Sequence, residues 1–203
     1  MRKNNEIHNL ISYADYCGCF RFSDIGFTTK SGMMFKFETD FRKACDTVHR
    51  ANMFMEIVYK ILITKLQHVD LFLGVPETGS IMSIFLNQIH QKKNPDKEIP
   101  LNMVRVEPKN YIRNAPVTVN PIIEPYDICI IEDDVVSGHT LYQYLDLLKC
   151  VPRKTINIVS IIDRNIVENN LSVKEKIESD YSYSYTSLIQ PHDLEEYFDR
   201  KLT

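Results

Sequence analysis

Apolar and polar positions alternate along the chain with two different periods. Residues 44–66 carry apolar side chains at mostly helical spacing, and a second helical stripe begins at Ser80. Short apolar runs typical of buried strands occur at residues 69–75, 126–134 and 155–163. Strands and helices therefore follow one another over much of the chain.

The remaining segments extend this alternation. Residues 101–107 predict another strand, residues 140–149 a helix, and residues 192–202 an acidic C-terminal helix after an apolar patch at 183–189. Residues 108–125 are rich in turn residues and show no strong period. Alternating strands and helices with short connections predict an α/β fold with a parallel sheet, whose ligands bind beyond the carboxyl ends of the strands.

The pattern favours one domain over residues 1–203, because it contains no internal repeat, low-complexity segment or linker. The first forty residues do not join the alternation. We therefore expect a small N-terminal cap or hood over residues 1–43 and an α/β core over residues 44–203.

Composition narrows the class of protein. With 203 residues, 44% of them hydrophobic and 25% charged, the chain is typical of a soluble globular domain rather than a disordered tail or a fibre. A net charge of −3 offers no electrostatic basis for binding a nucleic-acid backbone. No apolar run approaches the roughly 18 residues of a membrane-spanning helix, and the N-terminus does not resemble a secretory signal. We expect neither nucleic acid nor membrane as a partner.

The cysteines indicate a reducing, cytoplasmic location. Five of them lie at scattered spacings, which argues against a disulfide framework. Cys17 and Cys19 suggest at most a weak metal site, because no second pair accompanies them. We favour a structural role for both.

The strongest chemical feature lies at residues 128–140. A buried strand delivers Glu132, Asp133 and Asp134 to its carboxyl end, and a turn with hydroxyls and one glycine leads into a helix. Backbone N–H groups of such a turn suit a phosphate monoester, and the preceding carboxylates suit sugar hydroxyls or a metal. The alternative is that Asp134 or Ser137 caps the helix and the acids form a solvated strand end.

This segment resembles the ribose-phosphate fingerprint of the type I phosphoribosyltransferases, in which four apolar residues, two acids and two apolar residues precede a Thr/Ser/Gly turn. Walker A and Rossmann glycine patterns are absent from the sequence. The resemblance implies that Glu132 and Asp133 bind the ribose hydroxyls of phosphoribosyl pyrophosphate (PRPP). Asp134 departs from the family, which usually has an apolar residue there. The implied 5-phosphate loop consists of Val136, Ser137, Gly138, His139 and Thr140.

A second segment resembles the hood of orotate phosphoribosyltransferases. Residues 27–32 read Phe-Thr-Thr-Lys-Ser-Gly, and the aromatics Phe35 and Phe37 follow. Taken alone, this is a basic turn beside an amphipathic strand. The resemblance assigns Lys30 and Phe37 to contacts with the pyrimidine.

Residues 74–79, Gly-Val-Pro-Glu-Thr-Gly, lie between a predicted strand and a predicted helix. Bracketing glycines in a strand–turn–helix suit contact with a pyrophosphate, although an ordinary turn remains nearly as good an interpretation of these residues alone. The family's pyrophosphate loop lies at this point, which assigns Glu77 and Thr78 to PRPP.

A third loop begins at Arg105, at the end of the predicted strand 101–107. Long loops without regular structure in a compact domain are often lids. The family's catalytic loop reads Arg-Lys-x-x-Lys-Asp-His-Gly, so Arg105 would bind PRPP and Lys109 would reach the leaving pyrophosphate. The family's loop often acts across a dimer interface, which implies a homodimer. The chain departs from this pattern at Val106, Tyr111 and Ile112.

Arg164 ends the predicted strand 155–163 as part of Ile-Ile-Asp-Arg. An arginine at the carboxyl end of a strand can offer a two-pronged contact to a carboxylate. The alternative is a surface ion pair with Asp163. The family's Leu-Asp-Arg implies that Arg164 binds the orotate carboxylate, whereas Val136 stands where orotate enzymes often carry a threonine.

Taken together, the resemblance implies transfer of the phosphoribosyl group from PRPP to orotate, with release of pyrophosphate. Lys109, Glu132 and Asp133 would be the catalytic residues, and Mg²⁺ would be bound mainly through PRPP. Two alternatives stay open: a phosphoribosyltransferase for another base, such as a purine, and a non-catalytic regulator that senses PRPP. A Ser–His hydrolase is disfavoured, because the sequence has no Gly-x-Ser-x-Gly.

Overall fold

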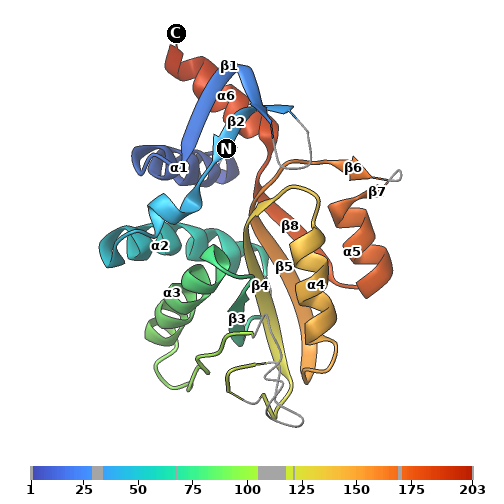
Figure 1. Cartoon of the computed structure of the whole chain (residues 1–203). Coiled ribbons are helices and arrows are strands. Elements are labelled where there is room, and N and C mark those ends of the chain that lie inside the picture. Colours follow the sequence, from blue (N-terminus) through green and yellow to red (C-terminus); the bar gives the residue numbers. More distant parts are fainter. Residues whose placement is uncertain are drawn as a thin grey trace.

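The predicted α/β fold is confirmed in the structure, a computed structural model. Its centre is a four-stranded parallel sheet with the strand order β3-β4-β5-β8, and helices cover both faces (Figure 1). The described residues are 2–28, 34–66, 68–104, 118–120, 122–168 and 171–202.

The elements follow the predicted alternation closely in the middle of the chain. The sheet consists of β3 (Leu71–Gly74), β4 (Tyr126–Val135), β5 (Arg153–Asp163) and β8 (Ser184–Ile189). The helices are α1 (Arg2–Tyr16), α2 (Val48–Lys65), α3 (Thr78–Lys93), α4 (His139–Leu148), α5 (Val173–Tyr181) and α6 (Pro191–Leu202), with a 3₁₀ turn at Phe41–Ala44. Two small antiparallel pairs complete the fold: β1 (Phe20–Thr28) with β2 (Met34–Thr39), and β6 (Val167–Glu168) with β7 (Leu171–Ser172).

The apolar run of β4 is buried on both faces, as expected for a central parallel strand. Ile128 and Ile130 pack into the core that contains residues of α4 and α5. Cys129 and Ile131 pack on the opposite face, into the core that contains residues of α1, α2 and α3. Because strand side chains alternate, the polar residues that follow at the carboxyl end of β4 point to both sides of the sheet.

The N-terminal segment divides into two parts. Leu10, Ile11 and Ala14 of α1 are buried in the main core, so this helix packs with the α/β body. The β1–β2 pair forms a separate small sheet beside the carboxyl ends of β4 and β5 (Figure 1). The structural counterpart of the expected hood is therefore this small sheet.

The strand predicted over residues 101–107 is wrong in its described part. Residues 101–103 form no strand, and Val104 makes a single antiparallel bridge to Thr118. The Asn102 side chain explains the difference, because its amide donates to the Asn120 carbonyl at 2.8 Å and its oxygen accepts from the Asn120 backbone N–H at 3.1 Å. Side-chain bonds thus replace a strand ladder here.

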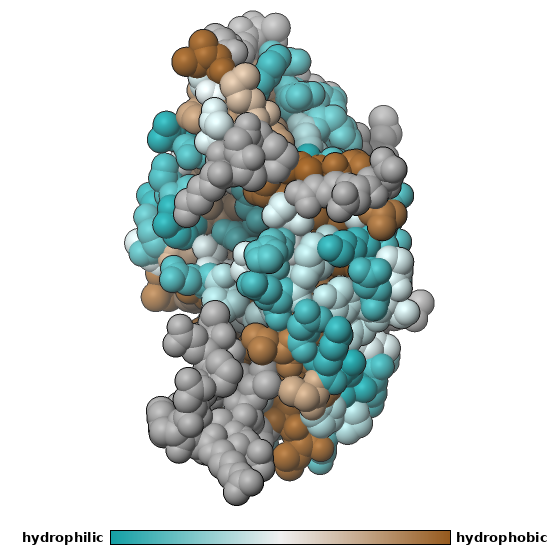
Figure 2. Space-filling view, turned by 45° about the vertical axis from the view of Figure 1, so that its right-hand side comes forward, coloured by the Kyte–Doolittle hydropathy of each residue, from teal (hydrophilic) through white to brown (hydrophobic). Residues whose placement is uncertain are grey.

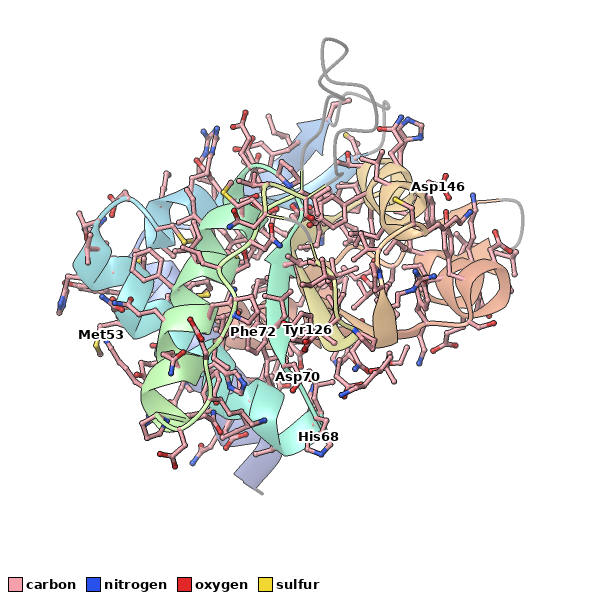
Figure 3. All side chains as sticks on the ribbon, turned by 90° about the horizontal axis from the view of Figure 1, so that it is seen from below. Met53, His68, Asp70, Phe72, Tyr126 and Asp146 are labelled. Carbon is pink, nitrogen blue, oxygen red and sulfur yellow. The ribbon has the colours of Figure 1, made fainter. Side chains whose placement is uncertain are left out.

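The opposite end of the sheet is held by charge and by hydrogen bonds. The Asp70 carboxylate accepts from the backbone N–H of Asp127 at 3.0 Å and lies 3.8 Å from the ammonium groups of Lys97 and Lys154. Figure 3, which views the molecule from this end, shows Asp70 beside Tyr126, where β4 begins. These contacts tie β3, β4 and β5 together away from the candidate site.

The surface over α4 and α5 is mainly hydrophilic, with apolar residues in separate patches (Figure 2). Within the described residues, none of the helices combines the length and apolar character that crossing a lipid bilayer requires.

Candidate active site

The loop between β4 and α4 lines an open pocket of about 150 Å³ at the carboxyl end of β4. All five residues of the predicted 5-phosphate loop line this pocket, together with side chains of β4. Helix α4 begins at His139, at the edge of the pocket. The backbone N–H groups of its first turn form the kind of site that binds phosphate in proteins.

Gly138 allows this loop to turn into the helix. Its φ of +73° is in the left-handed region, and a Cβ at this position would lie 2.9 Å from the ring of Tyr142. His139, which follows, is exposed, and its Nε2 lies 3.1 Å from the amide nitrogen of Gln143. The histidine therefore faces solvent while its backbone belongs to the loop.

Glu132 is a buried acid on the α4 side of the sheet, with a relative exposure of 8%. Burial, together with the negative charges of Asp133 and Asp134, raises its pKa to about 9. Among the described residues, neither its Oε2 nor the hydroxyl of Tyr144 has a hydrogen-bond partner. Glu132 is thus neutral at pH 7 and retains unused hydrogen-bonding capacity beside the pocket.

Asp133, the next residue, lies near Thr78 at the start of α3 and near Glu132. Burial raises its pKa, and a hydrogen bond with the Thr78 side chain opposes that shift. This contact joins the predicted ribose acid to the predicted pyrophosphate loop. Glu77 is the residue before α3, and its side chain makes no capping hydrogen bond to the helix.

The loop of residues 74–79 packs so tightly that only glycine fits at its two ends. A Cβ on Gly74 would lie 1.8 Å from the carbonyl oxygen of Gly79, and a Cβ on Gly79 would lie 2.5 Å from that of Ile131. The backbone N–H of Val75 donates to the same Ile131 carbonyl at 2.9 Å. The bracketing glycines are therefore required for this loop to lie against the end of β4.

Arg164 is buried rather than on the surface, and its partner is Asp134. Its Nε donates to Oδ1 of Asp134 at 3.0 Å and its Nη2 donates to Oδ2 at 2.6 Å. Asp163 instead accepts from the Tyr185 hydroxyl at 2.6 Å and from the backbone N–H of Asn165 at 2.8 Å. The alternative interpretation of a surface Asp163–Arg164 pair is therefore wrong.

The guanidinium of Arg164 also contacts β2. Nη1 donates to the carbonyl oxygen of Phe37 at 3.0 Å, and Nη2 donates to the hydroxyl of Thr39 at 2.9 Å. The Phe37 ring centre lies 4.5 Å from the guanidinium carbon, and the Phe35 ring centre lies 5.0 Å from it. Phe37 and Arg164, both predicted to contact the base, are thus adjacent.

Two further residues, Thr39 and Arg42, belong to this site although no sequence motif assigns them a role. The Thr39 hydroxyl donates to Asp134, which already accepts from Arg164. Arg42 is paired with Asp40, and the charges of Asp133 and Glu77 also act to raise its pKa. The sequence gives a hint of Asp134, because it stands where the family usually has an apolar residue. It gives no hint of Thr39, since only folding brings Thr39 beside Asp134.

Lys30, Arg105 and Lys109 lie outside the described residues, so their roles stay predictions. Among the residues that are described, no group of three or more His, Cys, Asp or Glu side chains is arranged to hold a metal. Glu132 is neutral and Asp134 is paired with Arg164, which leaves Asp133 as the carboxylate available at the end of β4. One carboxylate is enough for Mg²⁺ when substrate phosphates supply other ligands. The site therefore fits a magnesium ion that arrives with a phosphate-bearing ligand.

The sheet order, the β1–β2 pair and the loop after β4 define a class. The chain has the fold of the type I phosphoribosyltransferases. The orotate phosphoribosyltransferase of Francisella tularensis superposes with a TM-score of 0.75 and 19% identity, over 94% of this chain and 89% of that one.

Other solved structures share this fold. The UMP synthase of Leishmania donovani matches with a TM-score of 0.72 and 18% identity over 96% of this chain, which spans 38% of that longer protein. The adenine phosphoribosyltransferase of Leishmania tarentolae matches with a TM-score of 0.56 and 16% identity, over 92% of this chain and 90% of that one. No family model and no curated protein sequence matches the chain.

Proposed function

We propose that the chain is a phosphoribosyltransferase that transfers the 5-phosphoribosyl group of PRPP to orotate. The observation that carries the proposal is the position of the 5-phosphate loop and of residues 74–79, which both lie at the carboxyl end of β4. A loop suited to a phosphate thus lies at the same strand end as a loop suited to a pyrophosphate, with acids between them. PRPP carries both groups on one ribose, so one molecule matches both loops.

The proposed reaction makes few covalent demands on the protein. The bond between ribose C1 and the pyrophosphate oxygen breaks, and pyrophosphate leaves with the electron pair. A ring nitrogen of the acceptor donates its lone pair to C1, and the proton of that nitrogen passes to solvent. Positioning and electrostatics supply the catalysis. Asp133 and Glu132 would bind the ribose hydroxyls, and Lys109 would stabilise the leaving pyrophosphate.

Magnesium would neutralise charge on the pyrophosphate when bound. Asp133 is the carboxylate best suited to face it, since this side chain lies against Thr78 of the predicted pyrophosphate loop. Arg42 adds a positive charge near the same carboxylate and near Glu77. Asp133, Glu77 and Arg42 thus supply charges of both signs for a magnesium–pyrophosphate group.

Orotate is the proposed acceptor because a cation and aromatic rings meet at the predicted base end. Arg164 lies against Phe37, and Lys30 would approach from the hood turn. A neutral base is the second candidate, since Asp134 already occupies the guanidinium of Arg164. A purine acceptor belongs to the same class, as the fold also occurs in an adenine enzyme.

Two further parts of the proposal concern the oligomeric state and the cellular location. We expect a homodimer, in which the segment around Lys109 would serve the neighbouring site. We expect a cytoplasmic location, in line with the free cysteines.

Asp133→Asn tests the function. We expect turnover of orotate and PRPP with Mg²⁺ to fall by about a hundredfold or more, because one charged group at the ribose is lost. The matched control is Asp127→Asn, which makes the same change near the opposite end of β4, where Asp127 accepts from Thr155. Equal turnover in wild type and Asp133→Asn would refute the assignment.

A further inference from the structure

The predicted base end of the site already contains a carboxylate. Both oxygens of Asp134 accept from Arg164, at 3.0 and 2.6 Å. The Thr39 hydroxyl donates to Oδ2 of the same group. Asp134 is therefore held in the same way as the carboxylate of a bound ligand would be, by a two-pronged guanidinium contact and a hydroxyl.

This pair is shielded from water. The Arg164 side chain is 6% exposed and that of Asp134 is 19% exposed. Nη1 of Arg164 is also engaged, because it donates to the Phe37 carbonyl. All three nitrogens of the guanidinium therefore have partners within the chain.

An acceptor with a carboxylate meets an obstacle here. To reach Arg164 it must displace Asp134, which then loses its charged partner in a poorly solvated position. If Asp134 stays, two carboxylates lie side by side, which is unfavourable. A ring that carries no carboxylate meets neither cost.

We propose that Asp134 acts as an internal carboxylate that cancels the advantage of an acid-bearing acceptor, so that the site binds the uncharged pyrimidine ring as tightly as orotate. This inference rests on the proposed function, since it assumes that the acceptor lies beside Arg164. It extends that function from orotate alone to neutral pyrimidines. Asp134 is in these terms a specificity-determining residue.

A purely structural role makes a different prediction. If the pair only attaches β2 to the sheet, neutralising Asp134 changes stability but leaves the preference between two bases unchanged. The ratio of two dissociation constants measured on one variant cancels a general loss of stability. The ratio for orotate and uracil therefore separates the two roles, because uracil is the same ring without the carboxylate.

The test is calorimetric titration of the chain with orotate and with uracil. In wild type we expect the two dissociation constants to agree within about threefold. In Asp134→Asn and in Asp134→Val we expect the ratio to shift by about tenfold or more in favour of orotate, since Arg164 is then available. Asp40→Asn is the control, because Asp40 adjoins Thr39 but bonds Arg42, and its ratio should match that of wild type.

Three outcomes overturn the inference. The first is wild type that already prefers orotate by more than about tenfold. The second is an unchanged ratio in both Asp134 variants, and the third is a chain that binds neither base. Protection by PRPP against thermal unfolding is measured in parallel. PRPP binding without the expected ratios defeats this inference alone, whereas absence of PRPP binding defeats the proposed function.

Discussion

At the scale of single residues, the ionisation of Glu132 sets the character of the ribose end. A neutral carboxyl group donates one hydrogen bond and accepts others, whereas a carboxylate only accepts. With its pKa raised to about 9, Glu132 is neutral at pH 7 and can serve both roles towards a sugar hydroxyl. Its neighbour Asp133 has a hydrogen bond from Thr78 that favours the charged form.

The raised pKa of Glu132 predicts that stability falls as pH increases. The native state keeps the proton up to a pH of about 9, whereas the unfolded chain releases it near its ordinary value of 4.5. Between these values the unfolded state binds fewer protons, so each pH unit costs up to about 1.4 kcal/mol of unfolding free energy. Below the ordinary value both states are protonated and the effect vanishes.

Glu132→Gln tests this linkage. The variant cannot ionise, so its unfolding free energy in urea should exceed that of wild type by an amount that grows from pH 5.5 to pH 8. Titrating groups away from residue 132 are the same in both proteins and cancel in the difference, whereas the pKa of Asp133 depends on its neighbour Glu132. A difference that stays constant over this interval would contradict the raised pKa.

Several site residues could be predicted from the sequence because they are neighbours along the chain. Glu132, Asp133 and the loop of residues 136–140 follow one apolar strand, and their arrangement depends on that strand alone. The partner of Arg164 could not be predicted in this way. Thr39 lies 125 residues from Arg164 in sequence, and only packing of β2 against the main sheet brings them together.

At the scale of elements, the loop before α3 depends on backbone contact. Gly79→Ala would drive a Cβ against the Ile131 carbonyl, and a backbone atom in the central strand cannot move cheaply. We expect the unfolding free energy to fall by about 1–3 kcal/mol and the protection by PRPP to be lost. Thermal unfolding with and without PRPP measures both effects.

Gly18→Ala is the matched control for this loop. Its φ is +77°, but apart from its chain neighbours the atom nearest to a new Cβ is a Lys43 carbon at 3.9 Å, so only backbone strain is added. This variant should keep full protection by PRPP. Retained protection in Gly79→Ala would contradict the role of residues 74–79.

The elements that were predicted well are those with long apolar patterns. The strand predicted at residues 126–134 agrees with β4 to within one residue, because every position from Ile128 to Ile131 is buried. Helix α5 was missed, since only Val173 and Ile177 of it are buried. A signal for it was present, because Ser172 and Glu175 form a capping box that holds its first turn.

At the scale of the whole molecule, Arg164 connects the β1–β2 sheet to the central sheet. It leaves the end of β5, binds Asp134 of β4 and reaches Phe37 and Thr39 of β2. This single side chain therefore links the predicted base end of the site to both the β1–β2 sheet and the central sheet.

Substitution of Arg164 should loosen the β1–β2 sheet. We expect Arg164→Ala to lower the unfolding free energy by about 3 kcal/mol, because Asp134 is left without its partner. Arg164→Lys keeps the charge but not the planar fork, so its loss should be smaller. Hydrogen exchange of the β2 amides should accelerate in the same order, and unchanged exchange in the alanine variant would show that other contacts hold β2.

The activity proposed for this chain is transfer of a phosphoribosyl group from PRPP. The most direct measurement is release of pyrophosphate from PRPP with Mg²⁺ and orotate, followed together with the loss of orotate absorbance. We predict equal amounts of pyrophosphate formed and orotate consumed, and no release when the base is omitted. PRPP that binds but yields no pyrophosphate with orotate, uracil or adenine would contradict the claim and indicate a sensor of PRPP.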